Sequence, residues 1–346
     1  MRLQRLLALW QQIRSWISRQ LSWIDYALSF LRSPHQIVRA WPEGEIPLGP
    51  RVAIFVHFDA NGRVGAHVLH YVTSLHEAGI SVVFVTNSGE LQDAAFAALQ
   101  PVCAGILIRR NVGYDFGAMR EGLEYLKLPR ADTELALIIN DSVYGPLQPL
   151  DTLLARINFN TADMWGATES WQNRYHLQSY FVAAGRRALS SKAWQEFWTG
   201  VRPVKSKTWV VNKYEVGLTQ KLLRGGITCA AIWPYADMVD QVDGYYLIEP
   251  PKDKPVSTDP VLNMRRIQAH RIRHFSVTNT PLNPTSDLWR QLMEAGFPFV
   301  KRELLRDNPS FVADIGEWRE VAQRKFGPVP AAIDHDLHRV MKNRAP

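Results

Sequence analysis

The hydrophobic pattern of this chain changes period along its length. From Arg51 onward, short apolar runs alternate with segments that carry an apolar residue at every third or fourth position. The runs predict buried strands, and the spaced segments predict amphipathic helices. The predicted strands are 52–59, 80–85, 105–108, 135–139, 175–185 and 227–232, and the predicted helices are 64–78, 91–99, one opening within 111–123, 150–157, 188–198 and 214–226. This alternation favours an α/β fold with a mostly parallel sheet and right-handed crossovers.

The first 33 residues have a helical pattern of a different kind. Leucine, isoleucine and tryptophan recur at three- and four-residue steps, while arginine and glutamine fill much of the other side. The apolar runs are too short to span a bilayer or to form a signal-peptide core. Since tryptophan and arginine favour the headgroup layer, we expect a helix that lies flat on an anionic membrane surface. Packing of this helix on the protein body or on a partner helix is the alternative.

The pattern divides the chain into three parts. Residues 1–49 comprise the amphipathic helix and a linker rich in proline and glycine. Residues 50–245 contain the strand and helix alternation and form the predicted binding and catalytic domain. Residues 246–346 are expected to be a mostly helical extension, with helices around 287–295, 301–306 and 315–325.

Composition and charge narrow the class of protein. The chain has 346 residues, is 46% hydrophobic and carries a formal charge of +7, which is ordinary for a globular protein and excludes a disordered or fibrous one. The basic residues cluster in residues 1–40, with six arginines against Asp25, and in residues 265–274. Compact basic patches suit an anionic membrane or phosphorylated ligands, and without a nucleic-acid-binding motif no nucleic-acid partner is expected. The two cysteines lack the spacing of a metal knuckle and are interpreted as buried thiols.

Polar residues gather where the predicted strands end. They are His57 and Asp59, Asn87 and Ser88, the turn Asn111 to Asp115, and the run Asn140 to Ser142. Parallel strands present their carboxyl ends at one edge of a sheet, and α/β proteins bind ligands there. We therefore expect these four groups to converge on one crevice, next to the N-terminus of the helix that follows Gly113.

Four motifs resemble the rhamnan synthesis protein F family, over roughly residues 50 to 310. They are NVGYDFGAMREGL (111–123), NDSVYGPL (140–147), HLQSYF (176–181) and NPTSDLWRQLMEAGFPFVKRELLRDNP (283–309). Their order also resembles family-2 glycosyltransferases, with an Asn-x-Gly turn, a downstream Gly122, a strand ending in an acidic motif, and Glu215 ahead of Gly225 and Gly226. The resemblance implies a GT-A-like, Rossmann-like sheet.

The resemblance also implies an activity and a location. The expected activity is transfer of rhamnose or another hexose from a nucleoside-diphosphate donor to a growing, lipid-linked polysaccharide of the rhamnan, lipopolysaccharide or capsule type, with inversion. The expected place is cytoplasmic, peripheral on the inner face of the bacterial cytoplasmic membrane. The rival hypothesis is a non-catalytic subunit that binds a nucleotide sugar or glycan within a synthase complex.

The two catalytic residues implied are Glu215 and Asp141. Glu215 is the candidate general base, and its alternative role is a charge that favours a helix N-terminus. Asp141 is the only carboxylate at its strand end, because Asn140 and Ser142 stand where two aspartates are expected to flank one residue. One carboxylate with phosphate oxygens and waters is enough to hold Mg²⁺ or Mn²⁺, and a metal-independent site is the alternative.

The binding residues form three groups. The donor-binding candidates are His57, Asp59, Asn87, Asn111, Gly113, Tyr114, Asp115, Asn140 and Ser142. His176 and Gln178 are candidates for contact with the sugar or acceptor, and Arg265, Arg266, Arg271 and Arg273 for a diphosphate or lipid phosphate. Each of these residues also has an alternative role without ligand binding. These roles are a helix cap for Asp115, a cover over the sheet edge for Tyr114, a structural role for His176 and a solvated face for the arginines.

Overall fold

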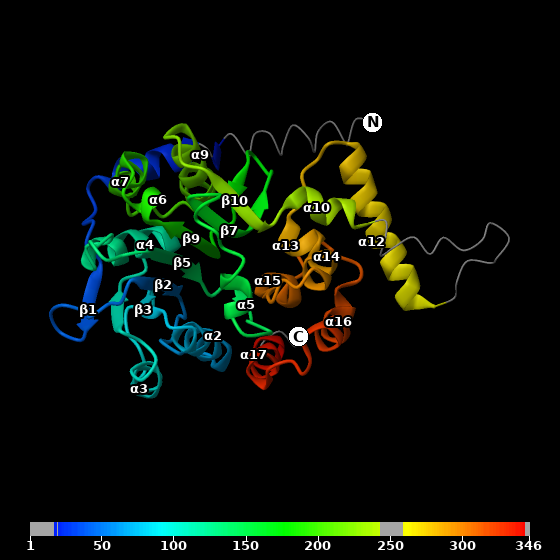
Figure 1. Cartoon of the computed structure of the whole chain (residues 1–346), viewed down its shortest axis with the longest axis horizontal. Coiled ribbons are helices and arrows are strands. Elements are labelled where there is room, and N and C mark those ends of the chain that lie inside the picture. The colour runs from blue at the N-terminus through cyan, green and yellow to red at the C-terminus, as the bar shows by residue number, and fades with distance from the viewer. Residues whose placement is uncertain (1–16, 19, 243–258, 343–346) are drawn as a thin grey trace.

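A mixed sheet forms the centre of the protein (Figure 1). The computed structural model describes residues 17–18, 20–242 and 259–342. In this part of the chain one sheet has nine strands and a second has two. The strands are β1 (Ile37–Trp41), β2 (Arg51–His57), β3 (Ser81–Thr86), β4 (Gly105–Arg109), β5 (Leu135–Asn140), β6 (Val143–Tyr144), β7 (Met164–Ser170), β8 (His176–Leu177), β9 (Phe181–Gly185), β10 (Cys229–Trp233) and β11 (Val300–Lys301).

The order of the main sheet places a switch point beside β2. The strands follow the order β1-β4-β3-β2-β5-β9-β7-β10, with β8 paired to β7. Strands β4, β3, β2 and β5 are parallel to one another, β7 is parallel to β10, and β1, β8 and β9 run antiparallel to their neighbours. The chain leaves β2 toward β3 on one side and reaches β5 on the other. Ligands of α/β proteins bind at such a point, outside the carboxyl ends of the strands.

Helices cover both faces of the sheet. They are α2 (Ala66–Glu77), α3 (Asp93–Leu99), α4 (Tyr114–Tyr125), α5 (Asp151–Leu154), α6 (Arg186–Leu189), α7 (Lys192–Gly200), α8 (Lys207–Trp209), the π-helix η1 (Val210–Glu215), α9 (Val216–Arg224) and α10 (Tyr235–Asp240). Alternate residues of β2 point to opposite faces, so Phe55 packs with α2 and Ile54 packs with α4. A Cβ at Gly122 of α4 would lie 3.1 Å from the side chain of Ile54. Glycine at this position therefore lets the helix lie close to the sheet. The predicted α/β fold with a mostly parallel sheet is confirmed.

The C-terminal segment packs against the same sheet and adds a core of its own. Its elements are α12 (Pro260–Val277), α13 (Pro284–Asp287), α14 (Trp289–Glu294), α15 (Arg302–Arg306), the 3₁₀ helix η2 (Ile315–Glu317), α16 (Trp318–Phe326) and α17 (Ala331–Lys342). Leu288 and Leu292 join the core that includes β2 and α2, while Trp289 and Trp318 form a separate cluster. Strand β11 pairs with β6, directly after the end of β5. The segment is thereby tied to the edge where the crevice is expected.

Three local predictions are wrong. The predicted linker contains β1, which pairs with β4 at the edge of the sheet. The predicted strand 175–185 is broken into β8 and β9 by the turn that contains Ser179. Glu215 does not lie in the first turn of a helix, because the chain is already helical from Lys207 and passes through η1 before α9 begins. The favourable helix-dipole position is therefore absent.

The N-terminal helix turns its polar side toward the protein. It is helical at residues 17–18 and 20–29, and the part of the predicted helix in residues 1–16 lies outside the described residues. Ser22 bonds Ser206 at 2.8 Å between their hydroxyl oxygens, and a carboxylate oxygen of Asp25 accepts from the backbone amides of Lys205 and Ser206 at 2.7 and 2.8 Å. The ring of Tyr26 stacks on Trp209. Packing on the body is thus found for this face.

The opposite side of the same helix is apolar and faces outward. Leu21, Ile24 and Leu28 are 60%, 55% and 48% exposed, whereas Ser29 on the packed side is 1% exposed. The usual orientation of an amphipathic helix on a globular protein is the reverse. Among the described residues, no helix is both long and apolar enough to cross a membrane.

Candidate active site

The polar strand ends converge as predicted. Asn140 Nδ2 at the end of β5 donates to Asp115 Oδ2 at the start of α4, at 2.9 Å. The hydroxyl of Ser88, which follows β3, accepts from the backbone amide of Asp59 at 3.1 Å. Asn87 Nδ2 reaches the carbonyl oxygen of Tyr114 at 3.3 Å. The ends of three parallel strands and the N-terminus of α4 therefore meet at one edge of the sheet, which is the place of the predicted crevice.

The turn that opens α4 has an uncommon backbone. Gly113 has a φ of 90°, and Tyr114 has a φ of 52°, so two successive residues adopt the left-handed region. Glycine suits the first position, since a Cβ there would also come within 3.3 Å of the backbone of Pro203. The side chain of Tyr114 extends outward, and its hydroxyl donates to the carbonyl of Lys205 at 3.0 Å. Asn111 is exposed at the start of this turn.

A buried ion pair holds the turn from below. Arg109 Nε donates to Glu121 Oε2 at 2.5 Å, and the guanidinium also bonds Asn87 Oδ1 and the carbonyl of Val112. The other oxygen of Glu121 accepts from the backbone amide of Gln36. Both charged side chains are almost fully buried. Removing one partner of such a pair leaves an uncompensated buried charge, so this cluster fixes the shape of the α4 turn.

Asp115 is an unusual carboxyl group within the crevice. Burial, followed by the nearby charges of Asp141 and Glu215, raises its pKa from 3.8 to about 7. The hydrogen bond from Asn140 and the charge of Lys207 act in the opposite direction. These interactions bring Asp115, Asp141 and Glu215 into one electrostatic group, although the three residues come from different elements. Clusters of this kind, with a perturbed pKa, are typical of functional sites.

Asp141 is paired with an arginine from the C-terminal segment. Arg302 Nη1 donates to the carbonyl oxygen of Asp141 at 2.8 Å and to its Oδ2 at 3.1 Å. The backbone amide of Arg302 donates to the carbonyl of Ser142 at 3.0 Å, so the strand pairing of β11 and β6 places this side chain. The flanking Asn140 Oδ1 accepts from both the amide and the hydroxyl of Ser142, at 3.1 and 2.6 Å.

In the described part of the chain, the hydrogen-bond partners of Glu215 are neutral groups. Its Oε1 accepts from the backbone amide and the hydroxyl of Ser179, at 3.1 and 2.9 Å. No described residue forms a hydrogen bond with Oε2. Ser179 lies in the turn between β8 and β9, so the break in the predicted strand is what presents both donors to Glu215.

Several predicted binding residues form hydrogen bonds within the fold. His57 Nδ1 is 3.1 Å from Thr86 Oγ1, and burial lowers the pKa of this imidazole. His176 Nδ1 is 2.8 Å from the carbonyl of Arg174. Gln178 Oε1 accepts from Thr168 at 2.7 Å. Asp59 Oδ1 accepts from two amides of its own loop, at Asn61 and Arg63. The assignment of these residues to donor or acceptor binding stays a prediction.

The four predicted phosphate-binding arginines lie on α12, which packs on the outer side of α13 and α14 (Figure 1). Arg265 forms an ion pair with Glu317, and Arg271 forms one with Asp287 at 2.7 Å. Arg266 and Arg273 are half-buried on the same helix. The assignment of these four arginines to a diphosphate or lipid phosphate stays a prediction.

Three residues near the crevice had no role in the sequence-based prediction. Arg302 lies within the RELLR run and Ser179 within HLQSYF, so both belong to motifs of the resemblance. Glu121 lies in the motif that opens α4. Their place in these motifs indicates a functional or structural role. Their partners lie elsewhere in the chain, so the sequence does not predict them.

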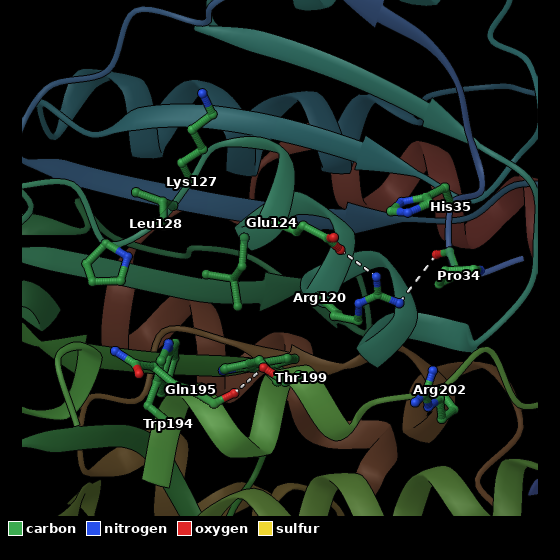
Figure 2. Close-up of a pocket in the computed structure, with 13 residues that line it drawn as sticks. Pro34, His35, Arg120, Glu124, Lys127, Leu128, Trp194, Gln195, Thr199 and Arg202 are labelled. Carbon is green, nitrogen blue, oxygen red and sulfur yellow. Dashed lines mark hydrogen bonds and ion pairs between the residues drawn. The ribbon is translucent and has the colours of Figure 1, made fainter. Parts of the chain in front are cut away.

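A hollow of about 470 Å³ lies away from the crevice, between α4 and α7 (Figure 2). Arg120 crosses it, bonded to Glu124 and to the carbonyl of Pro34. Leu123, Trp194 and Trp198 are among the apolar residues of its wall, and none of the predicted site residues lines it. The hollow is lined mainly by residues of α4 and α7 and is therefore separate from the candidate active site at the strand ends.

Comparison with known proteins supports the sequence-based resemblance. Residues 82–246 match the family model of Rhamnan synthesis protein F. This match spans β3 to the end of α10 and includes Asp115, Asp141 and Glu215. His57 on β2 and Arg302 on α15 lie outside the region matched to Rhamnan synthesis protein F. The predicted family resemblance is confirmed for the part of the chain that carries the three carboxylates.

Two curated relatives are distant. Virulence protein VirA of Vibrio anguillarum is 29% identical over 216 residues, which cover 60% of this chain and 64% of VirA. The uncharacterized protein y4gN of Sinorhizobium fredii is 26% identical over 201 residues, covering 57% of this chain and 52% of that protein. The chain thus matches less than two thirds of either relative.

Two solved structures are similar at low identity. One is a mannosyltransferase from Pyrobaculum calidifontis in complex with GDP-Man and Mn²⁺, 13% identical, with a TM-score of 0.34 over 95% of this chain and 90% of that one. The other is a galactosyltransferase in complex with donor and acceptor sugar analogues, 13% identical, with a TM-score of 0.36 over 82% of this chain and 99% of that one. At these TM-scores neither structure informs the site.

Proposed function

We propose that this protein is a glycosyltransferase that moves a sugar from a nucleoside-diphosphate donor to a growing cell-surface polysaccharide. Rhamnose is the first candidate sugar, given the match to Rhamnan synthesis protein F. The observation that carries the proposal is the gathering of Asp115, Asp141 and Glu215 at the carboxyl ends of parallel strands, next to the switch point of the sheet. Family and site support the same class of reaction independently.

The reaction requires three things that the crevice supplies in part. The acceptor hydroxyl must lose a proton, the leaving diphosphate must be stabilised, and the two substrates must be held in line. Glu215 has an oxygen without a described partner, Oε2, and a second oxygen held by Ser179, which suits a fixed general base. A base on the acceptor side of the anomeric carbon predicts inversion of configuration. The α4 turn and Asp115 face the same space and are proposed to bind the donor.

A divalent cation fits this site poorly. In the similar mannosyltransferase the bound ion is Mn²⁺. Here the Asp141 carboxylate is already bonded to Arg302, and Asn140 Oδ1 accepts two bonds from Ser142. The described residues include no group of three histidine, cysteine, aspartate or glutamate side chains arranged to hold a metal. The set of protein ligands for the expected magnesium or manganese ion is therefore incomplete among the described residues.

The N-terminal helix is proposed to hold the enzyme on an anionic membrane, where a lipid-linked acceptor would reside. Its outward stripe of Leu21, Ile24 and Leu28 is exposed. Lys205 and Lys207 are exposed beside it, and the six arginines of residues 1–40 add positive charge. Apolar burial combined with cation attraction is how an interfacial helix binds anionic lipid. The inner face of the bacterial cytoplasmic membrane is the proposed place.

A donor panel tests the proposed activity. The purified full chain is incubated with dTDP-rhamnose, UDP-hexoses and GDP-mannose, together with a bacterial lipid-linked glycan extract, and release of nucleoside diphosphate is measured. We expect release that depends on both one donor and the extract. Binding of nucleotide without release from any donor would favour the non-catalytic subunit.

Vesicle sedimentation tests the membrane proposal. The triple variant Leu21→Gln, Ile24→Gln, Leu28→Gln keeps Ser22 and Asp25, which attach the helix to the body. We expect the wild type to sediment with vesicles that contain phosphatidylglycerol and the variant to stay in the supernatant. The control variant Val277→Gln, Phe311→Gln removes exposed apolar residues elsewhere and should bind as the wild type does. Equal sedimentation of wild type and triple variant would contradict the proposal.

A further inference from the structure

Arg302 occupies the place at the end of β5 where a diphosphate-binding ion is expected. It comes from a segment that is far from Asp141 in the chain, yet two hydrogen bonds from Nη1 fix it to the carbonyl and the carboxylate of that residue. The pairing of β11 with β6 holds its backbone, since Val300 lies opposite Tyr144 and Lys301 opposite Val143. The position of the guanidinium is therefore set by strand register and not by a flexible loop.

The surroundings keep the guanidinium charged and oriented. Nη2 lies 3.4 Å from Asp336 Oδ2, which also accepts from the hydroxyl of Tyr144 at 2.8 Å. The ring of Tyr144 lies 5.4 Å from the guanidinium carbon. Arg339 binds the other oxygen of Asp336 at 2.6 Å, so the charge of Asp336 is shared. His67, beside Asp336, has its pKa lowered by burial to about 3 and adds no charge.

Arg302 retains the capacity to bind an anion. Its side chain is 22% exposed and that of Asp141 is 19% exposed, so neither is fully buried. Nη1 donates to Asp141 and Nη2 to Asp336, and because a guanidinium has five N–H donors, at least one donor remains. A guanidinium presents its donors in a planar fork that matches phosphate oxygens, and it stays protonated throughout the physiological range.

We infer that Arg302 takes the role of a divalent ion, binding the leaving diphosphate of the donor in a reaction that needs no metal. The inference rests on the proposed function. In the step, the bond between the anomeric carbon and the phosphate oxygen breaks and its electron pair stays on that oxygen. The acceptor oxygen bonds the anomeric carbon, and its proton passes to Glu215. The nucleoside diphosphate departs with one additional negative charge, which Arg302 stabilises. Asp141 orients Arg302 and does not itself contact the diphosphate.

Turnover in EDTA is the first test. With the donor found in the panel, we expect the wild type to keep its rate in excess EDTA, and added Mg²⁺ or Mn²⁺ to change it by less than about twofold. Arg302→Met should lower kcat by about 10²–10³-fold, the loss typical for removal of one group that stabilises developing charge. Arg302→Lys retains the charge without the fork and should lose less. Arg319→Met, which breaks an ion pair with Asp334 in the same segment, should turn over as the wild type does.

Nucleotide affinity separates the proposed role from a structural one. Calorimetry in EDTA compares dTDP, UDP and GDP with the corresponding monophosphates. We expect the wild type to prefer the diphosphate, and Arg302→Met to lose that preference while it still binds the monophosphate. A variant that is merely loosened would weaken both, and Arg302→Lys covers the case in which the methionine variant does not fold.

The outcomes distinguish this inference from the proposed function. Turnover that EDTA abolishes and Mn²⁺ restores would overturn the role of Arg302 but leave a glycosyltransferase. A diphosphate preference that survives Arg302→Met would overturn it as well. Absence of turnover with every donor would instead remove the proposed function on which the inference depends.

Discussion

Two carboxylates of the crevice lie in contrasting surroundings. Asp141, at the end of β5, is bonded to the guanidinium of Arg302. Among the described residues, Glu215, at the end of η1, is bonded to the amide and hydroxyl of Ser179 and to no charged group. Asp141 is thus tied to a cation, whereas Glu215 is held by neutral donors. The same functional group is therefore suited to two roles, as in other enzymes that use paired carboxylates.

This contrast indicates which side of the crevice binds the donor and which side binds the acceptor. The cation beside Asp141 suits the diphosphate of the donor, and Glu215, held by the neutral donors of Ser179, suits the hydroxyl of the acceptor. The negative charges of both residues act on Asp115, which is part of the reason that its pKa is raised to about 7. The three predictions that follow test this division of roles.

The largest effect is expected from Glu215→Gln. Removal of a general base should lower kcat by about 10²–10⁴-fold, while KM for the donor changes little. The glutamine oxygen can still accept from Ser179, so the local fold should persist. Steady-state kinetics with the donor from the panel provide the measurement. As a control, Glu196→Gln alters an exposed carboxylate that pairs with Lys221 on α9 and should leave kcat unchanged. A donor KM that rises while kcat holds would assign Glu215 to the donor side.

The second prediction concerns Asp115 and pH. Because its folded pKa of about 7 exceeds its ordinary value of 3.8, the folded state binds a proton that the unfolded state releases between about pH 4 and 7. The stability that this proton confers is present at low pH and lost as the pH rises through 7. Asp115→Asn should remove this loss of stability. Between about pH 4 and 7, the free energy of unfolding of the wild type should fall with pH more steeply than that of the variant, by at most about 1.4 kcal/mol per pH unit. Urea denaturation at several pH values measures the free energy of unfolding of both proteins. If this free energy depends on pH in the same way in wild type and variant, the raised pKa of Asp115 is contradicted.

The smallest effect is expected from Ser179→Ala. This change deletes the hydroxyl bond to Glu215 but retains the backbone amide bond, so the base loses one of its two fixing contacts. A hydrogen bond to a charged group is worth about 1.5–3 kcal/mol, and we expect kcat to fall about tenfold, well short of the loss for Glu215→Gln. Ser74→Ala, which removes a hydroxyl bond within α2, is the matched control. An unchanged kcat would mean that the turn between β8 and β9 does not position the base.

Much of the fold was predictable because its signals are local. The strands β2 to β5 and the helices between them match the predicted ranges within a few residues, since apolar period and turn residues report each element directly. The convergence of Asn87, Asp115 and Asn140 followed from parallel topology alone. The sequence does not predict the break at Ser179, because an alternating pattern does not reveal a short turn within it. The helical stretch before Glu215 was missed because a polar, lysine-rich segment resembles a loop.

The amino-acid pattern alone predicts the alternating architecture, the edge at which polar residues gather, and the single carboxylate at the end of β5. Three further features come from the folded chain: this carboxylate bonds Arg302, Glu215 bonds Ser179, and the N-terminal helix turns its apolar side outward. The physical reason is the same in each case. Periodicity records what a segment buries, but an ion pair between residues 161 positions apart depends on how the chain closes on itself, which no local pattern contains.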